Sequence, residues 1–127
     1  MVVDSSVLVA IAKDEPEALT FMELLSSSGY ASISSATVLE TSVVLRHAAG
    51  QVLLDRMVSG LDVIAFDARQ LLVAREAHRR YGRGSRHRAR LNFGDCFSYA
   101  LAMTTSQPLL FKGDDFLHTD VTPAYVR

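Results

Sequence analysis

Carboxylate side chains recur where the chain is expected to enter or leave a strand or a helix. Asp4 follows a short β-branched run, and Asp95 stands at the start of a long apolar run with helical spacing. Asp114 and Asp115 follow a further apolar stretch. An ionised carboxylate is unfavourable to bury without a partner, so acids at such positions call for an explanation. They are the first candidates for chemistry.

Another acid, Glu40, lies on the apolar face of a predicted helix rather than opposite that face. Three- and four-residue spacing places it beside Ala36, Val43 and Val44. A glutamate in this position either marks the edge of the apolar stripe or is held inward by a cation. Asp4 also has two interpretations: it belongs to a functional site, or it only caps the helix that follows it.

Strand signals and helix signals alternate along the chain and predict how these acids are positioned. We predict strands at 1–3, 30–33, 61–66 and 108–111, and helices at about 7–12, 16–28, 36–48, 52–58, 68–78 and 92–103. Asp14, Asp67 and Asn92 are predicted to cap the helices that follow them, and the helix over 36–48 is predicted to end before Gly50. This order predicts a three-layer α/β/α sandwich around a central, mostly parallel sheet, in one domain spanning residues 1–127. The carboxyl ends of parallel strands lie along one edge of a sheet, so the acids are expected to meet there.

Several carboxylates in one place repel one another, and at neutral pH they either take up protons or are neutralised by a cation. An all-oxygen set of ligands suits Mg²⁺ or Mn²⁺, whereas zinc would require histidine or cysteine. The four histidines show no zinc-ligand spacing, and neither a glycine-rich phosphate loop nor a nucleophile elbow is present.

Composition restricts the class of protein. The chain has 127 residues, of which 49% are hydrophobic and 21% charged, as expected of a folded globular domain. The net charge of −1 favours neither nucleic acid nor acidic ligands. Cys96 is the only cysteine, which excludes an internal disulfide, and we interpret it as a small buried residue. No basic leader and no apolar run of ~20 residues is present, so we expect a cytoplasmic protein.

One segment, residues 78–90, is rich in arginine and contains no acid. It is either a solvated loop or a loop that contacts phosphate groups, and its position directly before the Asp95 helix makes the second reading as strong as the first. Tyr81 within it is a candidate for stacking on an unpaired base. The loop could equally face the acids of a protein partner. The arginines considered for RNA binding are Arg79, Arg80, Arg83, Arg86 and Arg88.

Four segments resemble the successive motifs of PIN domains, and more narrowly those of the VapC-type ribonuclease toxins of type II toxin–antitoxin systems. The segments read VVDSS, SATVLE, LNFGDCFSYA and PLLFKGDDF and span residues 2–6, 35–40, 91–100 and 108–116. The resemblance covers essentially the whole chain. It implies a PIN-like fold, Mg²⁺-dependent endoribonuclease activity, a homodimer, and inhibition by a cognate VapB-type antitoxin.

Carried over position by position, the resemblance makes Asp4, Glu40 and Asp95 catalytic acids. The fourth is expected to be Asp114, with Asp115 as the alternative, because the preceding residues depart from the Thr/Ser-x-Asp arrangement of the family. Asp4 and Asp95 are expected to bind Mg²⁺, or Mn²⁺, directly.

The expected reaction is hydrolysis of an RNA phosphodiester by a metal-activated water, which leaves a 5′-phosphate and a 3′-hydroxyl. The alternative is a catalytically inert PIN-like module that binds RNA or protein. A phosphatase of the haloacid-dehalogenase type would need an aspartate two residues after Asp4, where Ser6 stands. The target RNA, the antitoxin and the number of metal ions do not follow from the sequence.

Overall fold

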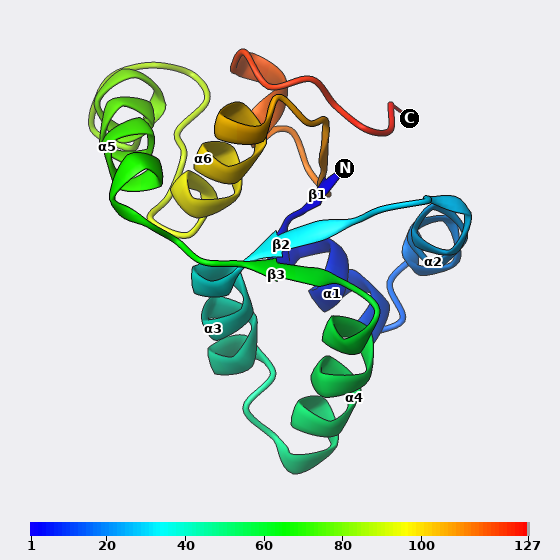
Figure 1. Ribbon diagram of the computed structural model, residues 1–127. Coiled ribbons are helices and arrows are strands. Elements are labelled where there is room, and N and C mark those ends of the chain that lie inside the picture. Colours follow the sequence, from blue (N-terminus) through cyan, green and yellow to red (C-terminus); the bar gives the residue numbers. More distant parts are fainter. Residues whose placement is uncertain (127) are drawn as a thin grey trace.

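The structure, a computed structural model, describes residues 1–126 and is built on a parallel sheet of four strands (Figure 1). The strand order is β3-β2-β1-β4, and every neighbouring pair is parallel. The strands are β1 (Val2–Val3), β2 (Ser32–Ser34), β3 (Asp62–Ile64) and β4 (Leu109–Leu110). The helices are α1 (Ser5–Ala12), α2 (Ala18–Ser27), α3 (Ser35–Val44), α4 (Ala48–Ser59), α5 (Ala68–Tyr81), α6 (Asp95–Thr105) and the 3₁₀ helix η1 (Asp115–His118).

Helices cover both faces of the sheet, with α5 and α6 on one side and α1 to α4 on the other (Figure 1). Successive side chains of a strand point to opposite faces, so even two-residue strands serve two cores. Val2 and Leu109 pack with residues of α5 and α6, whereas Val3 and Leu110 pack with residues of α1, α2 and α4. The predicted α/β sandwich with a parallel sheet is confirmed.

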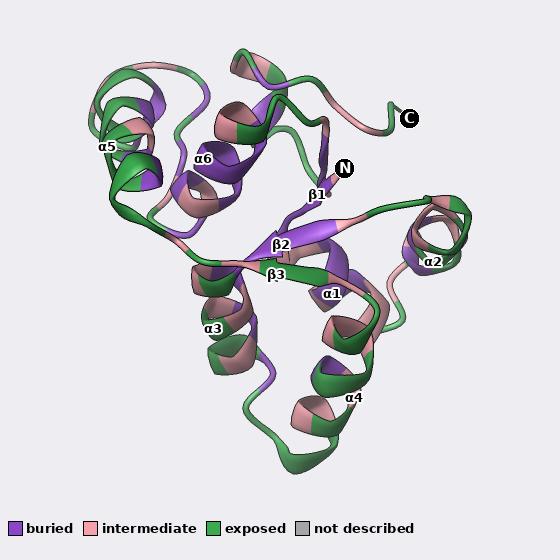
Figure 2. Cartoon of the chain, in the orientation of Figure 1, coloured by how far each residue is buried: buried purple, intermediate pink, exposed green. Residues whose placement is uncertain are grey.

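Burial is concentrated in β1, β2, β4 and α6, whereas the edge strand β3 is largely exposed (Figure 2). The apolar run from Cys96 to Ala102 is mostly buried, in agreement with its composition. Cys96 is 6% exposed, and burial raises the pKa of its thiol to about 11, so it is a neutral packing residue. Within residues 1–126, no helix has the length and apolar content needed to cross a membrane.

The prediction of one helix over residues 36–48 was wrong, because α3 ends at Val44 and a new helix begins before Gly50. The side-chain amide of Gln51 donates to the carbonyl oxygens of Ser42 and Leu45 at 2.9 and 2.7 Å and so satisfies the end of α3. A Cβ atom at Gly50 would lie 2.6 Å from the Leu45 oxygen. Gly50 therefore permits a close helix contact instead of terminating a helix.

The acids before α2 also act differently from the prediction, which made Asp14 the cap of that helix. Asp14 has a positive φ of 50°, and the helix begins later, after Glu17, which makes no side-chain cap. Glu15 and Glu17 instead form ion pairs with Lys112, and the Glu17 pair measures 3.1 Å. These acids link the α1–α2 connection to the segment that follows β4.

Candidate active site

Asp4 leaves β1 at the carboxyl edge of the sheet and caps α1. It is 2% exposed. Its Oδ2 atom accepts a hydrogen bond from the Ser6 backbone N–H at 3.1 Å, and its Oδ1 atom accepts one from the Ser98 hydroxyl at 2.5 Å. Its own backbone N–H donates to Leu110 at 3.0 Å. The carboxylate is therefore held in one orientation. Asp4 caps α1 and also contributes its carboxylate to the site.

Ser98 is a site residue that the sequence reasoning missed. It lies on α6, is fully buried, and has its hydroxyl 3.4 Å from that of Thr37, which is also fully buried. The single hydroxyl proton of Ser98 is donated to Asp4, so Thr37 must donate to Ser98. The signal available in the sequence was a serine three residues after Asp95, on the same face of an otherwise apolar helix.

Asp95 and Asn92 cap α6 reciprocally. The Asn92 Oδ1 atom accepts from the Asp95 backbone N–H at 2.9 Å, and the Asp95 Oδ2 atom accepts from the Asn92 backbone N–H at 3.0 Å. The predicted cap at Asn92 is confirmed, although the regular helix begins at Asp95. The arrangement holds the Asp95 carboxylate at the mouth of the helix.

The carboxylate of Glu40 reaches from α3 to the backbone at the start of α6. A Cβ atom at Gly94 would lie 1.6 Å from Glu40 Oε2, so the carboxylate occupies space that only a glycine leaves free. Glu40 Oε1 is buried and has no hydrogen-bond partner. Burial raises the pKa of Glu40, and the negative charge of Asp4 raises it further. A hydrogen bond with the Ser5 side chain acts in the opposite direction. This glutamate is held inward.

The carboxylates interact electrostatically as one group. Burial raises the pKa of Asp95 to about 7, the hydrogen bond from Asn92 opposes the shift, and the charges of Asp4, Asp115 and Glu40 add to it. The structure therefore brings Asp4, Glu40 and Asp95 into one anionic site at the carboxyl edge of the sheet.

Of the two acids after β4, Asp115 is the one whose charge raises the pKa of Asp95. Asp114 directly precedes η1 and lines a separate hollow of about 510 Å³ together with Lys112 and Leu117. The structure thus favours the alternative, Asp115, over Asp114 as the fourth acid.

The donor set of this site fits a hard divalent cation. Its donors are carboxylates, which Mg²⁺ and Mn²⁺ prefer, and Glu40 Oε1 is a buried oxygen without a partner. Within residues 1–126, no three acidic, histidine or cysteine side chains already converge as a formed metal centre. In the structure Asp4 accepts a hydrogen bond from Ser98, and Asp95 accepts one from the backbone of Asn92.

Comparison with known proteins identifies the family. The PIN domain family model matches residues 1–121. The chain is 46% identical to ribonuclease VapC42 of Mycobacterium tuberculosis, with 98% of each chain covered, and 45% identical to ribonuclease VapC30 of the same species, with 95% of each covered. The chain belongs to the PIN domain family, among the VapC ribonucleases.

Solved structures agree with this fold. A toxin–antitoxin complex from Klebsiella pneumoniae superimposes on this VapC-family chain with a TM-score of 0.74 at 18% identity, with 98% of each chain covered. VapC20 of Mycobacterium tuberculosis, described as a sarcin-ricin loop cleaving toxin, superimposes with a TM-score of 0.74 at 18% identity, with 95% of each chain covered.

The structure divides the arginines of this VapC-family domain into two groups. Arg79 forms an ion pair with Glu76 at 2.5 Å, and Arg80 lies 3.8 Å from Asp120. Within the described residues, no acid forms an ion pair with the other arginines of the segment, which are exposed. These are Arg83, Arg86, Arg88 and Arg90, and the last three line a hollow of about 360 Å³ with Gly84 and His87.

The expectation that Tyr81 stacks on an unpaired base was wrong. Tyr81 is 3% exposed, and its ring contacts His87 edge-to-face at 4.9 Å and Tyr99 at 5.9 Å. Its backbone oxygen also accepts from the Leu91 N–H at 2.9 Å, which closes the loop at its base. Tyr81 anchors the loop to the core, and the arginines project from that anchor.

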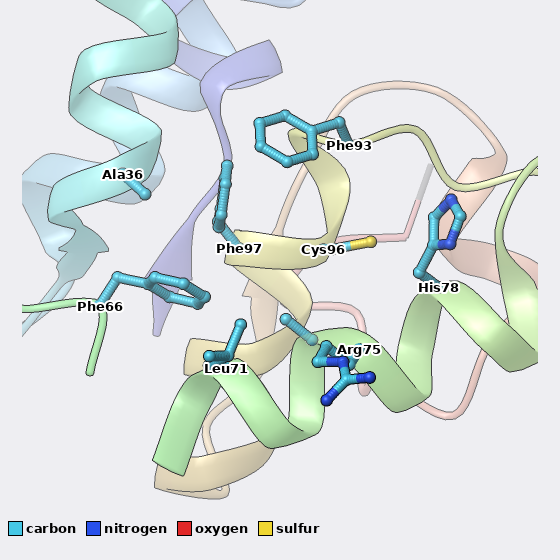
Figure 3. A pocket seen from close by; sticks show the side chains of 9 residues that line it. Ala36, Phe66, Leu71, Arg75, His78, Phe93, Cys96 and Phe97 are labelled. Carbon is cyan, nitrogen blue, oxygen red and sulfur yellow. The ribbon is translucent and has the colours of Figure 1, made fainter. Parts of the chain in front are cut away.

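A mainly apolar hollow of about 620 Å³ lies between α5 and the start of α6 (Figure 3). Figure 3 shows Phe66, Phe97 and Phe93 along one wall and Leu71 on α5, with Arg75 and His78 farther along the same helix. No acid lines it. It therefore offers a surface for packing rather than for hydrolysis.

Proposed function

We propose that this VapC-family chain is a metal-dependent endoribonuclease. The observation that carries the proposal is the convergence of Asp4, Glu40 and Asp95 at the carboxyl edge of the sheet, where burial and mutual repulsion raise the pKa of Asp95 to about 7. Relatives named ribonucleases, 45–46% identical over nearly the whole chain, support RNA as the substrate.

Asp4 and Asp95 would hold Mg²⁺ or Mn²⁺, and Glu40 and Asp115 would contribute further negative charge, with Asp114 as the less favoured fourth acid. When bound, such a cation neutralises the carboxylates, polarises a phosphodiester oxygen and lowers the pKa of a water molecule. The hydrogen bonds to Asp4 keep its carboxylate in one orientation.

Glu40 serves as the general base. Its Oε1 atom is buried without a hydrogen-bond partner, so it is available to accept a proton from the attacking water. Burial raises the pKa of Glu40, which makes its carboxylate a stronger proton acceptor. Attack by water rather than by the ribose 2′-hydroxyl leaves a 5′-phosphate and a 3′-hydroxyl.

The arginine-rich loop supplies contacts to RNA phosphates. Arg83, Arg86, Arg88 and Arg90 are exposed and free of acidic partners within residues 1–126, which supports this role. Arg79 and Arg80 contribute less, because Glu76 and Asp120 already neutralise part of their charge.

We further propose a VapB-type antitoxin as partner and a homodimer as the assembled form. The Klebsiella pneumoniae neighbour is a toxin–antitoxin complex, which supports the first of these. Light scattering tests the dimer, which would have twice the chain mass of 13.9 kDa.

A catalytically inert RNA- or protein-binding module remains the competing function, because no formed metal centre exists among residues 1–126. Incubation of the purified chain with structured RNA, in Mg²⁺ and in chelator, separates the two. Cleavage in Mg²⁺ alone, abolished in Asp95→Asn, supports the enzyme. Products ending in a 2′,3′-cyclic phosphate contradict the water mechanism, and intact RNA in Mg²⁺ supports the inert module.

A further inference from the structure

Phe93 is the most exposed large apolar side chain among residues 1–126, at 80% exposure. It lies on the turn that begins α6, directly before Gly94 and two residues before Asp95. The exposed Leu39 and Val43 of α3 line the same hollow as Phe93, so the ring is part of an apolar patch, and such a patch marks a surface that contacts a ligand.

The ring of Phe93 is supported from below by two further aromatic rings. Phe97, one helical turn later, meets it edge-to-face with centroids 4.9 Å apart and an interplanar angle of 81°. Phe66 meets Phe97 in the same way, at 4.9 Å and 78°. Figure 3 shows the three rings in series, with Phe93 at the outer end. The ring is thus presented to solvent by a packed support.

Phe93 and one of the proposed catalytic acids, Glu40, line the same hollow. A space of about 490 Å³ is lined by Phe93, Gly94, Phe97 and Glu40, together with apolar residues of α3. The Glu40 carboxylate packs against Gly94, the next residue after Phe93. A phosphodiester bound at the acids would therefore bring the base of an adjacent nucleotide to the ring of Phe93.

We propose that Phe93 is a stacking platform for an unpaired nucleobase next to the scissile phosphate. This inference rests on the proposed ribonuclease function. Sequence-tolerant RNA binding uses aromatic rings in this way, because every base has a flat face, and unpaired bases are the ones that can be presented. Phe93 therefore has the role that the buried Tyr81 cannot perform.

A protein partner is the competing occupant of this ring, and side-chain chemistry separates the two. Stacking requires an aromatic face, whereas a protein interface requires mainly apolar volume. Phe93→Leu keeps much of the apolar volume of the side chain but removes its flat aromatic face. Phe93→Trp keeps the face, and because the chain contains no tryptophan it also introduces a single fluorophore.

The test is RNA binding in chelator, where no metal-dependent cleavage occurs. The variants are Phe93→Leu, Phe93→Trp and the control Leu19→Trp, at a residue on α2 that is 72% exposed. We expect single-stranded RNA to quench the fluorescence of Phe93→Trp but not of Leu19→Trp. Phe93→Leu should weaken RNA binding by roughly tenfold or more and lower kcat/KM in Mg²⁺. An oligonucleotide lacking bases should quench neither tryptophan.

Equal quenching of both tryptophans, or wild-type RNA affinity in Phe93→Leu, overturns the stacking role. If Phe93→Leu binds RNA normally while Phe93→Asp converts a dimer into a monomer by light scattering, the ring belongs to a protein interface. A wild-type chain that neither binds nor cleaves RNA overturns the proposed function together with this inference. Cleavage by the wild type that Phe93→Leu matches overturns the inference alone. Unchanged thermal midpoints verify that the exposed substitutions leave the fold intact.

Discussion

The carboxyl group of Asp95 should make the proposed cation binding depend on pH. Burial raises its pKa to about 7, and neighbouring carboxylates add to the shift. Below that pH the metal-free chain holds this carboxyl protonated, and a proton competes with a cation for the same oxygens. At limiting Mg²⁺ we expect cleavage to increase as pH rises through about 7. Saturating Mn²⁺ should move the increase to lower pH, and rates measured at two metal concentrations test this. A pH–rate profile that is identical at the two metal concentrations contradicts this prediction.

Ser98 controls the orientation of Asp4 through a short hydrogen bond to a charged group. Ser98→Ala removes this donor and should reduce both metal affinity and cleavage by roughly tenfold, since bonds of this kind are worth about 1.5–3 kcal/mol. Calorimetric titration with Mn²⁺ measures the affinity without relying on activity. Thr104→Ala, which removes a hydroxyl bonded within α6, is the matched control. Equal metal affinity in the two variants would argue against an orienting role.

At the scale of elements, the start of α6 must approach α3 closely for Glu40 to reach the site. Gly94→Ala places a methyl group where the Glu40 carboxylate lies, and this carboxylate is the end of a flexible side chain that can move away. We expect the fold to survive and cleavage to fall by roughly 100-fold, as for the loss of a general base. Gly29→Ala, where an added Cβ meets nothing within 4 Å, is the control. Cleavage assays and thermal midpoints of both variants provide the test.

The arginine-rich loop is a second element with a testable role. Arg86 and Arg90 have positive φ angles of 68° and 54°, which asparagine tolerates better than most residues. The triple variant Arg86→Asn/Arg88→Gln/Arg90→Asn therefore removes charge without adding backbone strain. We expect weaker RNA binding and a salt dependence whose slope falls by about 2, from three lost single-strand phosphate contacts.

The matched control for the loop removes three exposed arginines elsewhere. The variant is Arg46→Gln/Arg56→Gln/Arg69→Gln, at positions before α4, in α4 and in α5. Both triples change the net charge equally, so a difference between their salt slopes reports local phosphate contacts. Identical slopes would exclude the loop from RNA binding.

For the whole molecule, the crowded acids make the metal-free fold less stable at neutral pH. The pKa of Asp95 is raised in the folded chain from an ordinary value of 3.8 to about 7. Between these values the folded chain keeps a proton that the unfolded chain has released. The free energy of unfolding therefore decreases as pH rises through this window and stays lower above it.

Removing this charge should stabilise the fold. At pH 7.5 we expect Asp95→Asn to be more stable than the wild type by about 1–2 kcal/mol, a figure reduced for solvent screening of a partly buried group. Urea denaturation in chelator from pH 5 to pH 8 measures the effect, with the exposed Asp55→Asn in α4 as control. Mg²⁺ should restore stability to the wild type but add less to the variant. If the free energy of unfolding depended on pH in the same way in Asp95→Asn and Asp55→Asn, repulsion among the site carboxylates would not be the cause.

Short-range patterns were enough to identify the succession of strands and helices, the caps at Asp67 and Asn92, and the acids at one edge of a parallel sheet. These features follow from neighbouring residues and from the common direction of the strands. Where two helices meet closely, at Gly50, the same patterns failed, because a glycine that permits contact looks like one that ends a helix.

Contacts between segments far apart in the sequence, and the burial of individual residues, were decided only by tertiary packing. Ser98 meets Asp4 across 94 residues of chain, and no periodicity predicts such a pair. Burial assigned Tyr81 to the core and left Phe93 in solvent, although both are aromatic residues in the part of the sequence that precedes Asp95. The physical reason is that exposure and charge coupling depend on which elements pack together, whereas helix and strand formation depend mainly on the residues within each element.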